Sequence, residues 1–347
     1  MAGREEAILL HAKMTMAAEK NPYGSVEKVF PLAINSYVRE GGRGYLGIKN
    51  VSAIPAEAVE RLKRAGYALH TLDRASFGGR AVDMGLANPV TGCPMTGSSS
   101  GTAVNVFLHF NDLGLGTDGG GSVLAPAMSL NLYGFISPLF CTEVMKKREK
   151  RSTDGISFFP SLGLIAREYE ELARGVEALL DLPDDGAEAA GAASEPPRVY
   201  RVEKDGLYQG EKRLGPAPDP AGGRRELIAF LMEVLPQCDW LISREGPVDV
   251  KAMGDSIFGH FDEETAREQR QSGKGLLRVV NMAGASALTM PESALGCAGL
   301  WICRSEPETV RRMLAAAAGV QPCRDEMTEW YFGNLDQYLD GGAFTLQ

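Results

Sequence analysis

The sequence lacks the residue patterns that mark several functional classes. Its six cysteines form no CxxC pair, so neither a zinc ribbon nor a thioredoxin-like redox site is expected. Only four histidines are present, which leaves little material for histidine-based catalysis. No apolar run reaches the ~18 residues that a membrane-spanning helix needs, so we expect no membrane partner.

Basic residues are also in the minority: 36 Lys and Arg face 45 Asp and Glu, a formal net charge of -9. This balance disfavours a nucleic-acid partner, because proteins that bind phosphate backbones present a basic face. A hydrophobic content of 44% and a charged content of 23% are typical of a globular chain. Scattered cysteines without a signal peptide predict a cytoplasmic location. We expect no cofactor and no metal.

The spacing of apolar residues predicts an α/β fold. Helical periodicity and its start and stop signals predict helices over 4–20, 55–69, 102–110, 167–182, 224–235 and 307–319. Short apolar runs predict strands at 45–50, 67–73, 199–208, 239–243, 286–292 and 299–305. Strands that alternate with helices of this length are typical of an α/β architecture with a substantial sheet.

The most informative segment, residues 96–127, holds two clusters of glycine and serine separated by an apolar run of helix length. A phosphate-binding loop is disfavoured because no lysine follows either cluster, and a dinucleotide-binding loop because LGLGTDGGGS follows a poor strand. GSSSG (97–101) matches a nucleophile elbow with Ser99 at its centre and His260 as a distant base, although NPVTGCPM before it is not a strong strand. Tight turns without chemistry are a further alternative.

Another interpretation adds Lys49, which ends the apolar run YLGIKN (45–50). A serine hydroxyl is a poor nucleophile and needs a base. Because burial lowers the pKa of a lysine, a desolvated neutral lysine can take that role where histidine is scarce. A second serine can carry the proton between them. Taken alone, Lys49 is typical of a surface lysine, and the serines are typical of turns.

These residues together resemble the amidase signature family. The family pattern is GGSSGGS, a helix, then GTDTGGSIRxPA, and the matching strings are TGSSSGT (96–102) and LGTDGGGSVLAPA (115–127). Aligned on the second string, the family's nucleophile falls on Ser122 and its bridging cis-serine on Ser98, 24 positions earlier. The family's lysine, in a strand ending IKD or VKD, falls on Lys49.

The resemblance extends over about 45–320. CDWLISREGP is similar to the family's YDVLLTPT strand, and VVNMAGASALTMPE to its NLAGLPAISVP element. It implies a large twisted mixed β-sheet covered on both faces by helices. We therefore expect an N-terminal helical segment (1–44), one trimmed amidase signature domain (45–320) with an exposed loop at 184–197, and a C-terminal tail (321–347).

Two departures concern the site and the substrate. The family's arginine after the nucleophile is replaced by Leu124, so Asp118 needs another partner if the two normally pair. Family members are usually longer, and the missing parts help to form the substrate funnel. The identity of the substrate is therefore the least constrained part of the resemblance.

The resemblance implies hydrolysis of a small carboxamide through an acyl-enzyme. Lys49 is the neutral base, Ser98 relays the proton and Ser122 attacks. The resemblance also implies a cis peptide bond between Gly97 and Ser98. The main-chain N–H groups of Gly119, Gly120 and Gly121 would form the oxyanion hole.

Supporting roles are implied for Thr117, Asp118 and Ser99. A homodimer is left open. The alternative function is a non-hydrolytic amidase-like subunit that binds a ligand or works in an amidotransferase complex.

Overall fold

A computed structural model describes residues 2–39, 41–152, 154–180, 196–249, 261–320 and 326–332. Its centre is a mixed sheet of twelve strands in the order β1-β3-β2-β6-β10-β7-β15-β16-β14-β11-β12-β13. The strands are β1 (Val26–Val29), β2 (Gly44–Lys49), β3 (Tyr67–Asp73), β6 (Leu113–Asp118), β7 (Tyr133–Ser137), β10 (Ser161–Ala166), β11 (Val199–Glu203), β12 (Gly206–Gln209), β13 (Lys212–Gly215), β14 (Trp240–Glu245), β15 (Ala285–Pro291) and β16 (Ala298–Arg304). Two short hairpins stand apart, β4 (Val82–Ala87) with β5 (Pro94–Thr96) and β8 (Lys150–Arg151) with β9 (Ser157–Phe158).

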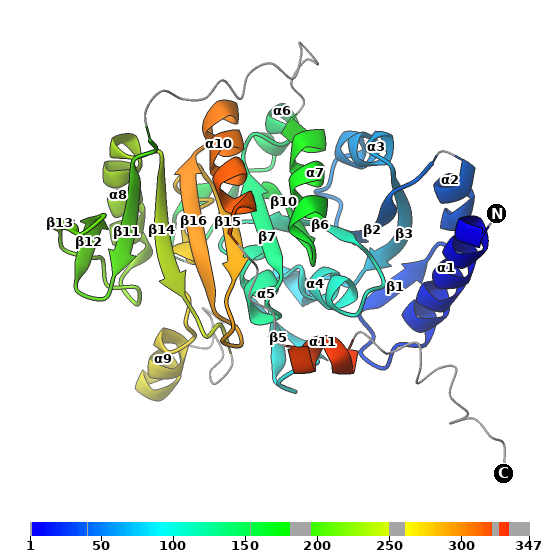
Figure 1. The fold of residues 1–347 in the computed structure, drawn as a ribbon. Helices are drawn as coiled ribbons and strands as arrows, with labels where there is room; N and C mark the ends of the chain where they lie inside the picture. Colours follow the sequence, from blue (N-terminus) through cyan, green and yellow to red (C-terminus); the bar gives the residue numbers. More distant parts are fainter. Residues whose placement is uncertain are drawn as a thin grey trace.

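Helices cover both faces of the sheet (Figure 1). They are α1 (Ala2–Lys20), α2 (Ala33–Arg39), α3 (Ala56–Arg64), α4 (Ser100–Phe107), α5 (Leu124–Ser129), α6 (Thr142–Met145), α7 (Tyr169–Leu180), α8 (Arg224–Val234), α9 (Glu263–Arg270), α10 (Pro307–Ala318) and α11 (Glu326–Phe332). One apolar core joins the sheet to α3, α7 and α10, and a second joins its other face to α4, α5 and α8. The expected fold class, a large mixed sheet between helical layers, is confirmed.

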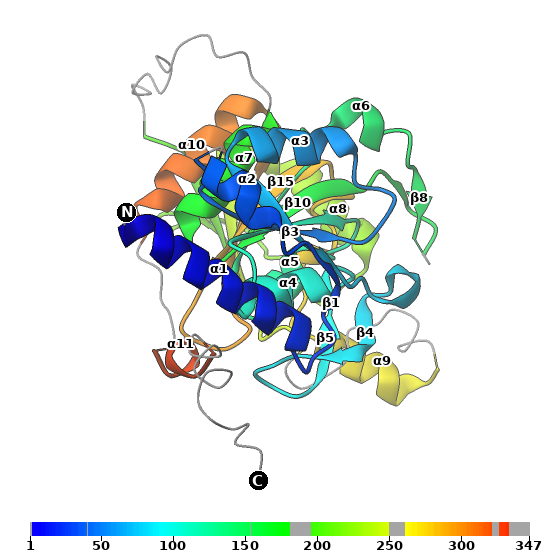
Figure 2. The ribbon, with the colours of Figure 1, turned by 90° about the vertical axis from the view of Figure 1, so that its right-hand side faces the viewer.

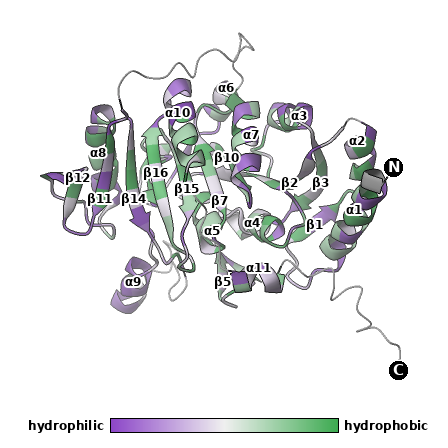
Figure 3. Ribbon diagram, viewed as in Figure 1, coloured by the Kyte–Doolittle hydropathy of each residue, from purple (hydrophilic) through white to green (hydrophobic). Residues whose placement is uncertain are grey.

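Burial explains which strands lie in the centre. β2, β6, β7 and β10 are buried at every residue, as strands covered on both faces must be. Figure 3 shows that hydrophobic residues are also concentrated in β15 and β16, whereas α9 is hydrophilic. The helices expected from periodicity are present, whereas periodicity did not predict the central strands β6 and β7.

Strand β6 forms over LGLGTD, where the spacing of apolar residues predicted no strand. Its glycines are required by close packing: a Cβ on Gly114 would lie 2.4 Å from Cγ2 of Thr102, and one on Gly116 would lie 2.6 Å from Oγ of Ser99. Both contacts come from α4 and its first turn. Residues without side chains therefore let the helix approach the sheet, and this tertiary contact outweighs the weak strand propensity of glycine.

The N-terminal segment also differs from expectation. Residues 1–44 contain α1 and α2, but β1 between them pairs antiparallel with β3 at the edge of the main sheet. The segment is thus not purely helical. The expected tail contains α11, and the loop expected at 184–197 lies outside the described residues apart from its last two. The division into segment, domain and tail stays a prediction.

Candidate functional site

The site forms where two parallel strands end side by side. β2 and β6 are neighbours in the sheet, with Ile48 opposite Leu115. Because parallel strands carry their carboxyl ends to the same edge, Lys49 at the end of β2 lies next to Thr117 and Asp118 at the end of β6. This edge is where open α/β sheets commonly bind ligands.

Lys49 is almost fully buried, with 3% of its surface exposed. Its Nζ donates to Oγ of Ser98 at 2.7 Å and to Oγ1 of Thr117 at 3.1 Å, and lies 3.4 Å from the Thr117 carbonyl oxygen. Burial lowers the pKa of Lys49 to about 7, Asp118 opposes this shift, and the charge of Lys150 adds to it. A lysine in this state can act as a base near neutral pH.

The two serines of the family pattern come from adjacent segments. Ser98 is buried and Ser122 is half-buried. The N–H of Ser99 donates to the Ser122 carbonyl at 3.1 Å, and a Cβ on Gly97 would lie 3.2 Å from the same oxygen. Gly97 adopts a φ of +72°, and the glycine allows both this conformation and the contact with Ser122. Lys49 is hydrogen-bonded to the Ser98 hydroxyl. Within the described residues, no hydrogen bond joins the hydroxyls of Ser98 and Ser122.

The expected cis bond at Gly97–Ser98 is not observed. Among the described residues the one cis peptide bond is Gly246–Pro247, so Gly97–Ser98 is trans. For a bond that does not precede proline, the trans form is favoured by ~3–4 kcal/mol in peptides. This part of the expectation is wrong, and Ser98 reaches Lys49 from a trans backbone.

Asp118 organises the glycine cluster through its carboxylate. The carboxylate accepts the N–H of Gly121 at 2.7 Å, of Val123 at 2.6 Å and of Leu124 at 3.3 Å. Main-chain N–H groups thus serve as the partners of Asp118, and Leu124 itself is fully buried in the apolar core. Burial raises the pKa of Asp118, and the backbone hydrogen bonds oppose that shift.

This arrangement involves one of the three expected oxyanion donors. The N–H of Gly121 is occupied by Asp118, so it is not available to a substrate. The N–H groups of Gly119 and Gly120 donate to no other group in the described part of the chain. The structure therefore leaves these two as candidate donors.

Ser99, the centre of the elbow alternative, is fully buried at the first turn of α4. Its hydroxyl lies 3.5 Å from the Thr117 carbonyl oxygen, and a Cβ on Gly116 would contact it. His260 lies outside the described residues. The short strand β5 does precede this turn, although it belongs to a two-stranded hairpin and not to the main sheet.

Sequence reasoning missed the residues that enclose the glycine cluster from the other side. Asn281 donates to the carbonyls of Phe159 at 2.8 Å and Gly119 at 3.5 Å, and it hydrogen-bonds Ser161. Leu277 packs against Gly121, where a Cβ would lie 2.5 Å from its Cδ1. The NMAGAS string that contains Asn281 was noted only as a likeness to the family, and that likeness was the available signal.

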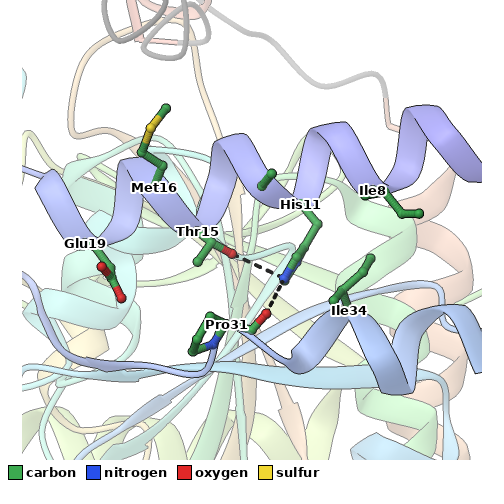
Figure 4. Close-up of a pocket in the computed structure, with 8 residues that line it drawn as sticks. Ile8, His11, Thr15, Met16, Glu19, Pro31 and Ile34 are labelled. Atoms are coloured by element: carbon green, nitrogen blue, oxygen red, sulfur yellow. Dashed lines mark hydrogen bonds between the residues drawn. The ribbon is translucent and has the colours of Figure 1, made fainter.

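A separate hollow of about 500 Å³ lies along α1 (Figure 4). It shares no residue with the Lys49 site and is lined by Ile8, His11, Ala12, Thr15, Met16, Glu19, Pro31 and Ile34. His11 Nε2 lies 3.1 Å from the Pro31 carbonyl oxygen, and the Thr15 hydroxyl lies between His11 and His70. These contacts dock α1 onto the sheet.

Three further properties concern the described residues as a whole. They contain no group of three or more His, Cys, Asp or Glu side chains placed to hold a metal ion. None of their helices combines the length and apolar character needed to cross a bilayer. Four of the five described cysteines are buried.

The segment that carries Lys49, Ser98 and Ser122 is similar in sequence to known proteins. The model of the Amidase family matches residues 43–139. A curated relative, Amidase 1 of Oryza sativa subsp. japonica, is 34% identical over 93 residues, which are 26% of this chain and 19% of that protein. The matched part thus spans about a fifth of the relative.

Solved structures resemble nearly the whole chain. The structure of 6-aminohexanoate cyclic dimer hydrolase has a TM-score of 0.58 at 16% identity and covers 90% of this chain and 92% of its own. Peptide amidase from Stenotrophomonas maltophilia has a TM-score of 0.57 at 15% identity, over 93% and 95% of the two chains. Allophanate hydrolase of Kluyveromyces lactis has a TM-score of 0.59 at 13% identity, over 93% and 72%. Residues 43–139 thus match the Amidase family, and the fold of nearly the whole chain is similar to the folds of these solved structures.

Proposed function

We propose that this protein hydrolyses a small carboxamide by transferring the acyl group to Ser122. The single observation that carries the proposal is the buried contact of 2.7 Å between Nζ of Lys49 and Oγ of Ser98, beside the backbone of Ser122. A neutral amine in that position accepts a proton, and the adjoining hydroxyl can pass one on.

In the proposed first half-reaction, Oγ of Ser122 attacks the amide carbon while its proton passes to Ser98. The proton of Ser98 passes to Lys49. Two main-chain N–H groups, of Gly119 and Gly120, stabilise the negative charge on the carbonyl oxygen. Loss of one such donor typically costs ~2.7–4 kcal/mol of transition-state stabilisation.

Collapse of the tetrahedral intermediate completes this first half-reaction. The C–N bond breaks, and the amine or ammonia leaves with a proton returned through Ser98. In the second half-reaction, water attacks the acyl-enzyme and its proton passes through Ser98 to Lys49. A carboxylate is released and Ser122 is free again. Thr117, whose hydroxyl accepts from Lys49, orients the base, and Asp118 holds the N–H of Gly121 next to the two donors.

The test is covalent labelling followed by an amide screen. A fluorophosphonate probe should label Ser122, and labelling should disappear in Ser122→Ala and Lys49→Ala. Release of ammonia or amine from a panel of small amides should depend on the same residues. Labelling at Ser99 that survives Lys49→Ala would overturn the proposal in favour of the elbow. An unlabelled protein that turns over no amide would instead favour a non-hydrolytic subunit.

A further inference from the structure

The hairpin of β8 and β9 projects from the side of the molecule that also carries β4 (Figure 2). Lys150 and Phe158 are directly opposite one another in this antiparallel pair. Residues in that relation project to the same face of the ribbon, and the next residue along each strand projects to the other face. Lys150 and Phe158 therefore share a face, and Arg151 lies on the opposite one.

That shared face is turned toward the candidate oxyanion donors. The ring of Phe158 lies so close to Gly119 that a Cβ there would come within 2.5 Å of Cε2. Gly119 follows Asp118 and lies two residues after Thr117, which contacts Lys49. The positive charge of Lys150 also acts on Lys49 and helps to lower its pKa.

Other cations near this face already have partners. Arg224 pairs with Asp154 at 3.1 Å. The guanidinium of Arg278 donates to the carbonyls of Gly275, Pro220 and Gly222. The side chain of Lys150, in contrast, is exposed and makes no hydrogen bond or ion pair with any residue of the described ranges.

We propose that Lys150 is a specificity residue that binds an anionic group of the substrate, so that the preferred substrates are amides carrying a carboxylate away from the bond that is cleaved. The inference rests on the proposed function of Ser122. An ammonium at the rim attracts a carboxylate by charge and by hydrogen bonding, and the neighbouring apolar ring of Phe158 limits the water that competes for it.

The experiment compares two serine-directed fluorophosphonates of equal length, one ending in a carboxylate and one in the neutral methyl amide. The rate of labelling at Ser122 is measured for each probe. The ratio of the two rates is the readout, because it does not require the natural substrate to be known. In the wild type we expect the carboxylate probe to react about tenfold faster at low ionic strength, and salt should reduce the ratio.

The variants separate a role of Lys150 from general effects of charge. Lys150→Met should abolish the preference, Lys150→Glu should invert it, and Lys150→Arg should retain most of it. Lys147→Met is the matched control, because it removes the same charge from an exposed lysine three residues away and should leave the ratio unchanged.

The outcomes distinguish this inference from the proposed function. Efficient labelling by both probes at a ratio that is the same in wild type and Lys150→Met would overturn the role of Lys150 and leave Ser122 as the nucleophile. An equal loss of the preference for the carboxylate probe in Lys147→Met would also overturn it, because the net charge of the protein alone would then explain that preference. Failure of both probes to label Ser122 in the wild type would contradict both proposals.

Discussion

At the scale of single residues, Lys49 sets the pH range of the proposed activity. Burial lowers its pKa from 10.5 to about 7, so the amine loses its proton within the physiological range. Because the base must be neutral, kcat/KM should rise through about pH 7 as the pH increases. A pH–rate profile on any accepted amide measures this.

Lys49→Arg should abolish activity at every pH, by the ~10²–10⁴-fold typical of a lost general base, because a guanidinium keeps its proton in proteins. Thermal denaturation of this variant shows whether it is folded. A profile that is flat between pH 6 and 9 in the wild type would contradict the assignment of Lys49 as the base.

Asp118 provides a second residue-scale prediction. Asp118→Asn replaces one acceptor oxygen by an N–H₂ group that faces backbone donors, leaving at least one of them unpaired in a buried site. We expect a loss of stability of ~1–3 kcal/mol and a larger loss of labelling at Ser122. The matched control is Asp112→Asn, which changes a half-buried carboxylate that accepts the N–H of Tyr45 away from the site. That variant should lose stability but keep its labelling rate per folded molecule.

At the scale of elements, the approach of α4 to β6 positions Ser98. Gly114→Ala would place a methyl group 2.4 Å from Cγ2 of Thr102, so the helix must move. Overpacking of this kind costs ~1–3 kcal/mol, and we expect a lower melting temperature together with slower labelling of Ser122. Thr102→Ser removes the clashing methyl and should restore part of both. Gly215→Ala is the control, because a Cβ there meets nothing within 4 Å. Absence of rescue by Thr102→Ser would show that this contact does not position α4.

The same pair of elements shows how far sequence reasoning reaches. The apolar run of α4 and the strand ending at Lys49 follow from periodicity, and the family likeness places Ser98 and Ser122. Strand β6 could not be predicted in this way, because Gly114 and Gly116 lower strand propensity. Glycine is needed at these positions because α4 packs closely against them, which the local sequence does not reveal. The occupation of the Gly121 N–H by Asp118 also depends on loop geometry that no local pattern encodes.

A further element-scale prediction concerns Asn281, which ties the Gly119 carbonyl to that of Phe159. Asn281→Ala removes both links and leaves the side chain of Ser161 without this partner. Because Asn281 touches no group in the proton path, we expect a lower rate of labelling with an unchanged pH profile. A shift of the profile would indicate instead that Asn281 acts on Lys49 directly.

At the scale of the whole molecule, the N-terminal segment is part of the same folded unit as the site. The Ser25 carbonyl accepts the N–H of Arg74 at 2.9 Å, and the Ser25 hydroxyl donates to Asn105 of α4 at 2.6 Å. Asn105 in turn donates to Asp73 at 2.7 Å, and Asp73 is opposite Lys49 in the parallel pair of β2 and β3. Buried polar groups thus connect the N-terminal segment to the base.

This connection predicts that residues 45–320 do not fold on their own, even though the family resemblance covers them. Removal of residues 1–44 uncovers the edge of β3 and leaves Asn105 and Asp73 without part of their buried network. We expect the truncated chain to show no cooperative thermal transition by circular dichroism. Full-length Ser25→Ala should still unfold cooperatively, with stability reduced by ~1 kcal/mol for one lost hydrogen bond. A 45–320 fragment with a sharp transition and a labelled Ser122 would instead establish the boundary at 44/45 as a true domain boundary.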